Sequence, residues 1–441
     1  MKKPETPPSP VVDDFDKIVK IFNDTLTIAK LNEIEKTYPY WDKFKYKIKD
    51  INYDTNTLWR YIKMTRSSTS RDLKISEIDG FKFKYNTNGK IQELLHQFDL
   101  NLGGKLEGGA VIPNDDKERL LISSIMEEAI ASSQLEGAVT SREVAKEMLR
   151  SERKPKDKSE KMILNNYLTI KKIIDIKNKN LSPDLIREIH SIVSKGTLKE
   201  GANEGVFRKN NEVKVVNEMD GEIFYNPPDY EKLEKLIEDF CIFANNKNNG
   251  DFIHPIIKAI ILHFLIGYIH PFVDGNGRTA RAIFYWYLIS QGYWLVEYLS
   301  ISRIIVKSPT RYAQSYLYTE YDENDLTYFI YYNLKAMNLA LKSLKEYINR
   351  KIKERKNLFD IVKNEDINER QAEIIKELIT DSQKTLTIKS IKSQFNVVYQ
   401  TARTDLFKLI ELGYLQEKYV GNKILFFRSN EFEHKIKRIL K

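Results

Sequence analysis

At the centre of the chain stands the stretch His270-Pro271-Phe272-Val273-Asp274-Gly275-Asn276-Gly277-Arg278-Thr279-Ala280-Arg281. The strongly apolar run Ile256–Ile269 before it predicts a buried helix that ends at His270. The run from Ala280 to Gln291 predicts a second helix directly afterwards. We therefore expect two consecutive helices joined by a short loop that is rich in glycine and charged groups.

The side chains of this loop are those used in phosphate chemistry. Gly275–Gly277 permits positive φ angles, so successive N–H groups can point at one anion at the start of a helix. Asp274 offers the hard oxygen ligand that Mg²⁺ prefers. Arg278 and Arg281 would share a helix face from which both can grip phosphate oxygens. His270 titrates near neutral pH and can take a proton from an attacking hydroxyl.

The stretch resembles, at every specified position, the signature HPFx(D/E)GNGRxxR of the Fic (fido) family. The resemblance implies transfer of AMP from ATP to a protein hydroxyl, with His270 as the base and Asp274 as the Mg²⁺ ligand. It also implies that Gly275–Gly277 bind the α and β phosphates, that Arg278 contacts the β phosphate region and that Arg281 contacts the γ phosphate. The intact Gly-Asn-Gly favours transfer of AMP over transfer of phosphate itself.

Segments on either side extend the resemblance. Glu204–Arg208 looks like the family's G-x-(Y/F)-R, and the β-prone runs Glu212–Val216 and Glu222–Tyr225 predict a hairpin. This hairpin is similar to the flap that holds the target's modifiable side chain by strand addition. Nucleotide contacts are expected from Asp274, Gly275, Asn276, Gly277, Arg278, Thr279, Ala280, Arg281, Tyr312, Phe224 and Tyr225.

A second feature bears on regulation. Lys117–Glu136 has helical periodicity, and Gly137 is a natural helix stop, which places the Glu136 carboxylate at the negative end of the helix dipole. That placement is unfavourable unless a cation compensates. The segment that starts at Ser132 resembles the family's inhibitory motif (S/T)xxxE(G/N). The resemblance implies that Glu136 pairs with Arg281 and blocks the γ phosphate, and that Ser132 steadies the glutamate side chain.

Composition sets broad limits. At 441 residues, with 41% hydrophobic and 30% charged residues, the chain is typical of a globular protein with two or three domains. Its net charge of +9 suits ATP or nucleic acid without requiring either. The single cysteine, Cys241, rules out an internal disulfide framework. Because no run of about eighteen apolar residues and no secretory signal occurs, we expect a cytoplasmic protein without a membrane segment.

The last part of the chain has a different pattern. Helices are predicted over Asn368–Thr380, Ile388–Phe395 and Tyr399–Leu412, followed by a hairpin over Tyr414–Phe427. Three helices and a β-wing indicate a winged helix-turn-helix, a fold that binds either DNA or a protein partner, and the sequence leaves both open. Candidate DNA contacts are Gln400, Thr401, Arg403, Thr404, Lys408, Lys418 and Lys423.

The expected fold class is mainly α: an all-helical Fic core with a small β-hairpin flap, plus the C-terminal winged helix-turn-helix. The expected divisions are a disordered lead-in over residues 1–14, an N-terminal Fic-associated module over 15–109, an inhibitory helix region and linker over 110–180, the Fic core over 181–340, a helical linker over 341–364 and the winged helix domain over 365–441.

The leading functional hypothesis is a Mg²⁺-dependent protein adenylyltransferase that uses ATP, modifies a Ser, Thr or Tyr hydroxyl of a target protein and is inhibited by the pairing of Glu136 with Arg281. The chain itself could be a target, through auto-AMPylation or as a homodimer. Two alternatives stay open at this point. One is a DNA-binding regulator with a nucleotide-sensing core, and the other is removal of AMP by the same site.

Overall fold

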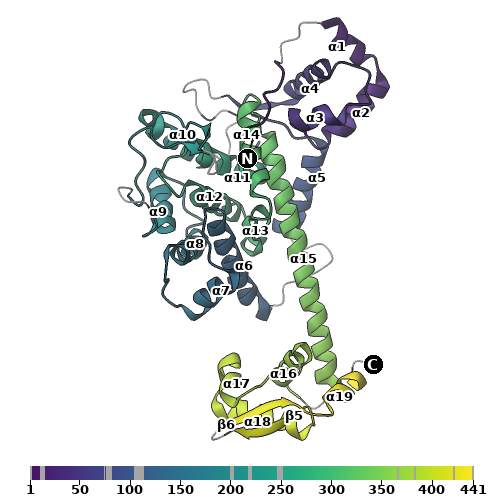
Figure 1. Ribbon diagram of the computed structural model, residues 1–441, viewed down its shortest axis with the longest axis vertical. Coiled ribbons are helices and arrows are strands. Elements are labelled where there is room, and N and C mark those ends of the chain that lie inside the picture. The colour runs from purple at the N-terminus through teal and green to yellow at the C-terminus, as the bar shows by residue number, and fades with distance from the viewer. Residues whose placement is uncertain are drawn as a thin grey trace. The chain divides into compact units, whose positions relative to one another are not determined.

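A computed structural model of the chain describes residues 2–9, 15–73, 75, 82–103, 114–198, 203–216, 221–245, 252–364, 367–381, 384–420 and 423–439. The chain divides into two compact units, Met1–Leu344 and Lys345–Lys441. The fold is mainly α, as expected, and the described strands form three two-stranded antiparallel hairpins (Figure 1). None of the helices, within the residues described, is long and apolar enough to cross a membrane.

The first unit begins with a small helical module whose core is aromatic. Trp41, Phe44 and Trp59 pack together, with ring centroids 5.2–5.6 Å apart. Burial of such large rings supplies most of the hydrophobic stabilisation available to a module of this size. Its elements are α1 (Phe15–Phe22), α2 (Thr25–Glu35), α3 (Trp41–Lys47), α4 (Thr55–Thr69), β1 (Arg71–Leu73), β2 (Phe83–Tyr85), α5 (Gly89–Phe98) and the π-helix η2 (Asp99–Gly103).

Two buried cations join this module to the rest of the first unit. The Lys63 ammonium lies 2.7 Å from the Asp322 carboxylate, with both side chains at most 5% exposed. The Arg66 guanidinium bonds both Glu35 oxygens and, through Nη1, the hydroxyl of Tyr328. Because a buried charge is tolerated only when it is paired, these contacts hold α4 in one position against the chain around Asp322.

The remaining elements of the first unit surround two central helices. Figure 1 shows α11 and α12 side by side, with α6, α8, α9 and α10 packed around them. The elements are α6 (Asn114–Gln134), α7 (Arg142–Ser151), α8 (Lys158–Asp175), α9 (Pro183–Ser194), β3 (Val215–Val216), β4 (Ile223–Tyr225), η3 (Tyr230–Lys232), α10 (Leu233–Asn245), α11 (Pro255–Ile269), α12 (Asn276–Ser290), η4 (Trp294–Tyr298), α13 (Ser302–Ile305), α14 (Pro309–Tyr321) and α15 (Thr327–Asn364), within which the boundary between the units falls.

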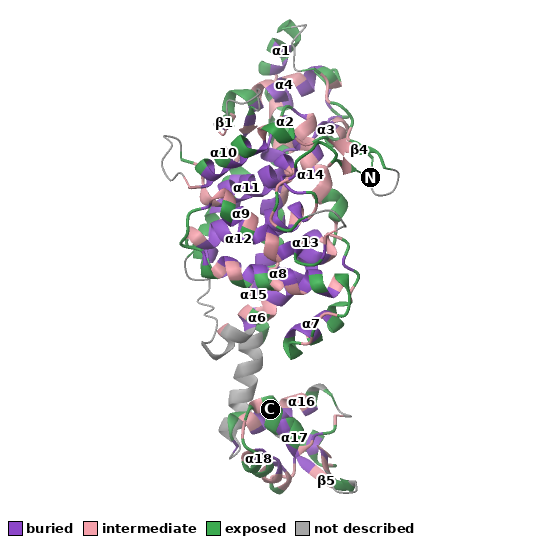
Figure 2. Cartoon of the chain, turned by 90° about the vertical axis from the view of Figure 1, so that its left-hand side faces the viewer, coloured by how far each residue is buried: buried purple, intermediate pink, exposed green. Residues whose placement is uncertain are grey.

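The sequence explains why α11 and α12 are central. Nearly every side chain of both helices is buried, and both are coloured as buried in Figure 2. A helix that is apolar all round must lie inside a protein, whereas an amphipathic helix covers the surface of a core. Pro255 begins α11, where its missing N–H costs nothing, and the nitrogen Nδ1 of His254 caps the first turn by accepting from Ile256 N.

The second unit holds α16 (Glu369–Thr380), α17 (Ile388–Phe395), α18 (Tyr399–Glu411), the paired strands β5 (Leu415–Val420) and β6 (Lys423–Arg428), and α19 (Phe432–Ile439). Ile375, Ile391, Leu406 and Phe426 meet in one apolar core. The three helices and the hairpin therefore occur in the order that the sequence predicts. Their assignment as a winged helix remains a prediction.

Two sequence expectations can be compared directly with these elements. The hairpin predicted between Glu212 and Tyr225 is present, since β3 and β4 pair through Val215 with Tyr225 and Val216 with Ile223; residues 217–220 lie outside the described part. Residues 2–9, for which a disordered lead-in was expected, run without regular structure, and the carbonyl of Glu5 accepts a hydrogen bond of 2.7 Å from the Tyr40 hydroxyl.

The buried ion pair yields a stability prediction. Replacing Lys63 with Met leaves Asp322 buried without its cation, and we expect the free energy of unfolding of the first unit to fall by about 3–5 kcal/mol. Lys90→Met, which breaks the exposed pair with Glu93, is the matched control and should cost less than about 1 kcal/mol. Denaturant titration followed by tryptophan fluorescence measures this, because all four tryptophans lie in residues 1–344. Equal losses in the two variants would contradict the assignment.

Candidate active site

The turn between α11 and α12 has an unusual backbone. His270 ends α11 with a φ of 50° and Gly275 precedes α12 with a φ of 86°, so both lie in the left-handed region. Such a conformation is costly for a residue with a side chain and persists only where neighbours hold it. Asn276 closes the turn: its Oδ1 accepts from Phe272 N at 2.9 Å and its Nδ2 donates to Phe272 O at 2.8 Å.

Arg208 holds the turn from the opposite side. Its backbone N–H donates to Pro271 O at 2.8 Å, and its Nε donates to His270 O at 3.0 Å. The same guanidinium bonds the carbonyl of Pro228, which follows the β3–β4 hairpin. Arg208 is itself buried, and burial lowers the pKa of its guanidinium. One side chain thus fixes the His270 backbone relative to the segment that leads out of the hairpin.

His190, on α9, holds the far end of the turn. Its Nδ1 accepts from Gly205 N at 2.9 Å, so its proton is on Nε2, which donates to Asp274 O at 2.8 Å. Its ring stacks on Phe272 with centroids 3.6 Å apart. Burial lowers the pKa of His190 to about 4. The sequence analysis missed this role of His190, because its spacing from the motif contains no signal that it bonds Asp274.

The imidazole of His270 is oriented by its own helix. Nδ1 lies 3.0 Å from the carbonyl of Gly267, and because a carbonyl can only accept, Nδ1 carries the proton and Nε2 is the basic nitrogen. Burial lowers the pKa of His270, which keeps the imidazole neutral at neutral pH. A neutral imidazole with Nε2 unprotonated can accept a proton.

Asp274 has the features of a carboxylate that shares a cation with other ligands. Its Oδ1 accepts from Gly275 N at 2.6 Å, and the Arg278 guanidinium lies 3.9 Å away. Its side chain is 38% exposed, so the carboxylate faces solvent. In the described part of the chain no group of three or more His, Cys, Asp or Glu side chains lies close enough to hold a metal. The residues present therefore suit Mg²⁺, which keeps most of its ligands as water and phosphate oxygens.

The end of α6 meets α12 at Arg281. Arg281 Nη2 lies 2.9 Å from Glu136 Oε1, and both Arg281 Nε and Nη2 bond Ser132, at its hydroxyl (2.7 Å) and its carbonyl (3.0 Å). Burial alone would lower the pKa of Arg281, but the charge of Glu136, the hydrogen bond to Glu136 and the charges of Tyr312 and Glu128 together raise it. The expected contact of Glu136 with Arg281 is thus present. The expected position of Ser132 needs correction, because Ser132 orients the arginine instead of the glutamate.

The Glu136 carboxylate lies directly against the start of α12. A Cβ atom placed on Gly277 would come within 2.3 Å of Glu136 Oε1 and 3.0 Å of Glu136 Cδ. Only a glycine leaves room for this approach. A carboxylate at the N-terminal turn of a helix, beside an arginine, lies where the helix dipole and the arginine charge favour an anion.

Glu128, two turns earlier on α6, was missed by sequence reasoning. Its carboxylate accepts from Ser302 N at 3.0 Å, from the Ser302 hydroxyl and from the Ser300 hydroxyl at 3.2 Å. Burial raises the pKa of Glu128 although these hydrogen bonds oppose the shift. It joins α6 to the start of α13, and this contact helps to set the position at which α6 presents Glu136.

The other motif residues make contacts within the protein. Arg278 is 1% exposed and donates from Nη1 to Val193 O at 2.9 Å. The backbone N–H and the hydroxyl of Thr279 both donate to Gly275 O, and Ala280 is buried. The Tyr312 hydroxyl lies 2.8 Å from Nε2 of the buried His263. The nucleotide contacts expected of Arg278, Thr279, Ala280 and Tyr312 remain predictions.

Phe224 and Tyr225 lie on β4 of the hairpin. The Tyr225 ring packs against Tyr268, with centroids 5.0 Å apart, and Tyr268 lies two residues before His270. Burial raises the pKa of the Tyr225 hydroxyl above its usual range. The hairpin is thus adjacent to the end of α11, while the nucleotide contacts expected of both residues remain predictions.

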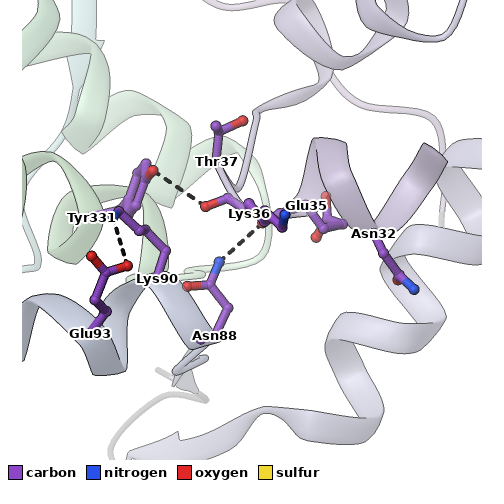
Figure 3. A pocket seen from close by; sticks show the side chains of 9 residues that line it. Asn32, Glu35, Lys36, Thr37, Asn88, Lys90, Glu93 and Tyr331 are labelled. Carbon is purple, nitrogen blue, oxygen red and sulfur yellow. Dashed lines mark hydrogen bonds and ion pairs between the residues drawn. The ribbon is translucent and has the colours of Figure 1, made fainter. Parts of the chain in front are cut away.

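A hollow lies elsewhere in the first unit. Figure 3 shows it, between the end of α2, the start of α5 and Tyr331 of α15, with a volume of about 660 Å³. Asn88 Nδ2 donates to Glu35 O at 3.0 Å and the Tyr331 hydroxyl donates to Lys36 O at 3.3 Å, so its walls are joined to one another. None of the predicted site residues lines it.

These observations define a mainly helical domain built around a glycine-containing turn between two buried helices. The profile of the Fic/DOC family matches residues 180–288, which include that turn. The chain therefore contains a Fic/DOC domain.

Relatives and solved structures agree with this assignment. A 67-residue segment is 42% identical to "Protein adenylyltransferase Fic" of Nematostella vectensis and 37% identical to the protein of that name from Drosophila virilis. The segment spans 15% of this chain and only 16% and 14% of those relatives. A crystal structure of a Fic family protein from Desulfovibrio desulfuricans G20 covers 78% of this chain and 97% of its own, with a TM-score of 0.54 and 17% identity, and shows the shared fold.

The low pKa of His190 predicts a loss of stability in mild acid. His190 stays neutral in the fold down to about pH 4, whereas in the unfolded chain it titrates near 6.5. Its contribution is complete above pH 6.5 and is lost as the pH falls toward 4, with about 2 kcal/mol lost between pH 7.5 and 5. The free energy of unfolding is followed by tryptophan fluorescence at pH 7.5 and at pH 5. Its decrease between these two pH values should be smaller in His190→Gln than in the unmodified protein by about 2 kcal/mol. The same dependence in both proteins would refute this.

Proposed function

We propose that the chain is a protein adenylyltransferase that transfers AMP from ATP to a Ser, Thr or Tyr hydroxyl of a target protein and is held inactive by Glu136. The proposal rests chiefly on one observation: the unprotonated nitrogen of a neutral His270 and the anion-favouring start of α12 belong to one turn that neighbouring helices hold rigid. The names of the relatives that match a 67-residue segment of this chain point to the same activity.

In the proposed reaction, His270 Nε2 accepts the proton of the target hydroxyl while the oxygen of that hydroxyl attacks the α phosphorus of ATP. A bond forms between that oxygen and the α phosphorus, the bond from the α phosphorus to the bridging oxygen of the β phosphate breaks, and pyrophosphate leaves. The backbone amides at Gly275–Gly277 would stabilise charge on the phosphate oxygens without reorganising. Asp274 would hold Mg²⁺, which supplies neutralisation of phosphate charge when bound.

Autoinhibition follows from which anion Arg281 binds. In this structure Arg281 is committed to Glu136 and Ser132, and its guanidinium is 4% exposed. We propose that the γ phosphate of ATP competes with the Glu136 carboxylate for this arginine, so that productive binding requires the carboxylate to leave. Because an unpaired Arg281 would leave a charge buried, the carboxylate leaves only when the phosphate takes its place.

The first prediction concerns the base. In a Glu136→Gly background, where transfer is measurable, His270→Ala should reduce labelling of target protein by radiolabelled ATP by on the order of a hundredfold or more, since the proton acceptor is lost. ATP affinity, measured by calorimetry, should change little. His96→Ala, at an exposed histidine of α5, is the control and should leave both quantities unchanged. Retained labelling in His270→Ala would exclude the proposed base.

The second prediction concerns the inhibitory contact. Glu136→Gly should raise AMP transfer by on the order of tenfold to a hundredfold, because it releases a charged hydrogen bond of about 1.5–3 kcal/mol that opposes ATP. Gln134→Gly introduces glycine at the same helix end without touching Arg281, and should leave the rate near that of the unmodified protein. A rate that stays unchanged or falls in Glu136→Gly would argue against inhibition, and faster release of AMP from labelled target by the unmodified protein would favour AMP removal.

A further inference from the structure

The second unit has an outer face that its apolar core does not use. Within that core, α18 contributes Ala402, Leu406 and Leu409, all fully buried. Glu411, the last residue of α18, is exposed and pairs with Lys408 at 3.5 Å. On the opposite side of the first half of the helix the residues left exposed are Tyr399, Gln400, Arg403 and Thr404. Their spacing of three and four places these side chains on one helix face. We call these four residues the outer face of α18.

The charges of this unit are sorted between the inside and the outside. Asp405 is 3% exposed, and its carboxylate is bonded by Arg370 Nε at 2.8 Å and Asn368 Nδ2 at 2.8 Å. Asp405, in the middle of α18, thus points into the unit. Arg403 points outward and lies over the ring of Phe407 at 5.0 Å. With Asp405 turned inward, the outer face carries the positive charge of Arg403, while the exposed Glu411 lies at the far end of α18 and pairs with Lys408.

Neighbouring elements add to the same sign. Lys389 and Lys392 are exposed on α17, which packs against α18, and Lys418 is exposed on β5. Residues 345–441 contain 21 Lys and Arg against 14 Asp and Glu, which is +7 of the total charge of +9. The basic excess of the chain is therefore concentrated in its last 97 residues, and an anionic partner would be attracted there.

The surface suits a nucleic acid better than a protein. Among the described residues of this unit, the exposed large hydrophobic side chains are Ile379, Val398, Tyr399 and Tyr419. Protein interfaces are built around an apolar centre, whereas three of the four residues of the outer face of α18 are polar or charged. Gln, Arg and Thr are side chains that bond base edges and phosphates, and an α-helix fits the major groove of B-form DNA.

The ends of the face can also engage phosphates. Val398 precedes α18 and provides no side-chain cap, so the first N–H groups of the helix lack one. At the other side, the hairpin of β5 and β6 presents Lys418 and the 64% exposed Tyr419. A helix flanked by two such elements matches the way in which a winged helix contacts the backbone on either side of a groove.

We propose that the outer face of α18 binds duplex DNA, with α18 in the major groove and Lys392 and Lys418 on the flanking phosphates. This function is independent of AMP transfer. The interaction is electrostatic in large part, so it weakens steeply as salt displaces the released counterions.

The test uses the full chain and a fluorescein-labelled 24-base-pair duplex of random sequence, with binding followed by anisotropy at 50 and 200 mM salt. We expect binding at 50 mM salt that weakens on the order of a hundredfold at 200 mM, and a loss on the order of tenfold or more in Arg403→Glu. Lys161→Glu, at an exposed lysine on α8 of the first unit, makes the same change in charge and should bind as the unmodified chain does. Circular dichroism confirms that both variants fold.

Three results would overturn the proposal. The first is no binding at 50 mM salt, and the second is an equal loss in Arg403→Glu and Lys161→Glu, which would reflect net charge alone. The third is a chain that does not bind DNA but self-associates in sedimentation experiments, with the association lost in Arg403→Glu. That result would assign the outer face of α18 to a protein contact. A catalytically inactive His270→Ala chain should bind the duplex as the unmodified chain does.

Discussion

The arrangement of the first unit depends on a backbone turn that the chain cannot adopt without outside help. Two left-handed residues, His270 and Gly275, bracket the connection between α11 and α12. The strain at His270 is balanced by the hydrogen bond that its carbonyl accepts from Arg208 and by the one that its backbone N–H donates to Ile266 O. His190 fixes the other end. Because both helices are buried on all sides, the turn has no freedom to relax, and the basic nitrogen of His270 has a defined position relative to the start of α12.

In the proposed function, the same rigidity lets Arg281 act as a switch. Its guanidinium is buried, so losing an anionic partner would be costly, and Glu136, Tyr312 and Glu128 together raise its pKa against the effect of burial. Glu136 reaches it from α6, and Glu128 holds that helix against the start of α13. In the proposed function an ATP phosphate takes the place of the Glu136 carboxylate. Arg281 is then paired with an anion in both states. Regulation then requires only a local movement at the end of α6, and the catalytic turn need not be rebuilt.

Much of this site could be anticipated from short-range patterns. Apolar periodicity predicted α11, α12, α16, α17 and α18, and the spacing of the hairpin runs predicted β3 and β4. The contact between Glu136 and Arg281 was implied by two motifs and is present. Other parts could not be anticipated. Ser132 bonds the arginine and not the glutamate, and His190 proved to bond the turn, because hydrogen bonds between distant segments leave no periodic trace in a sequence.

By itself, then, the sequence determined the chemical groups of the site and the helices that carry them, since both follow from residue types and local spacing. It also determined that the basic excess is concentrated in the last 97 residues. Only the tertiary structure decided which nitrogen of His270 is basic, that Glu136 lies against Gly277, and that Asp405 points inward while Arg403 points outward. The reason is physical: these properties depend on the partner that each polar group finds when burial removes its water, and that partner comes from elsewhere in the chain.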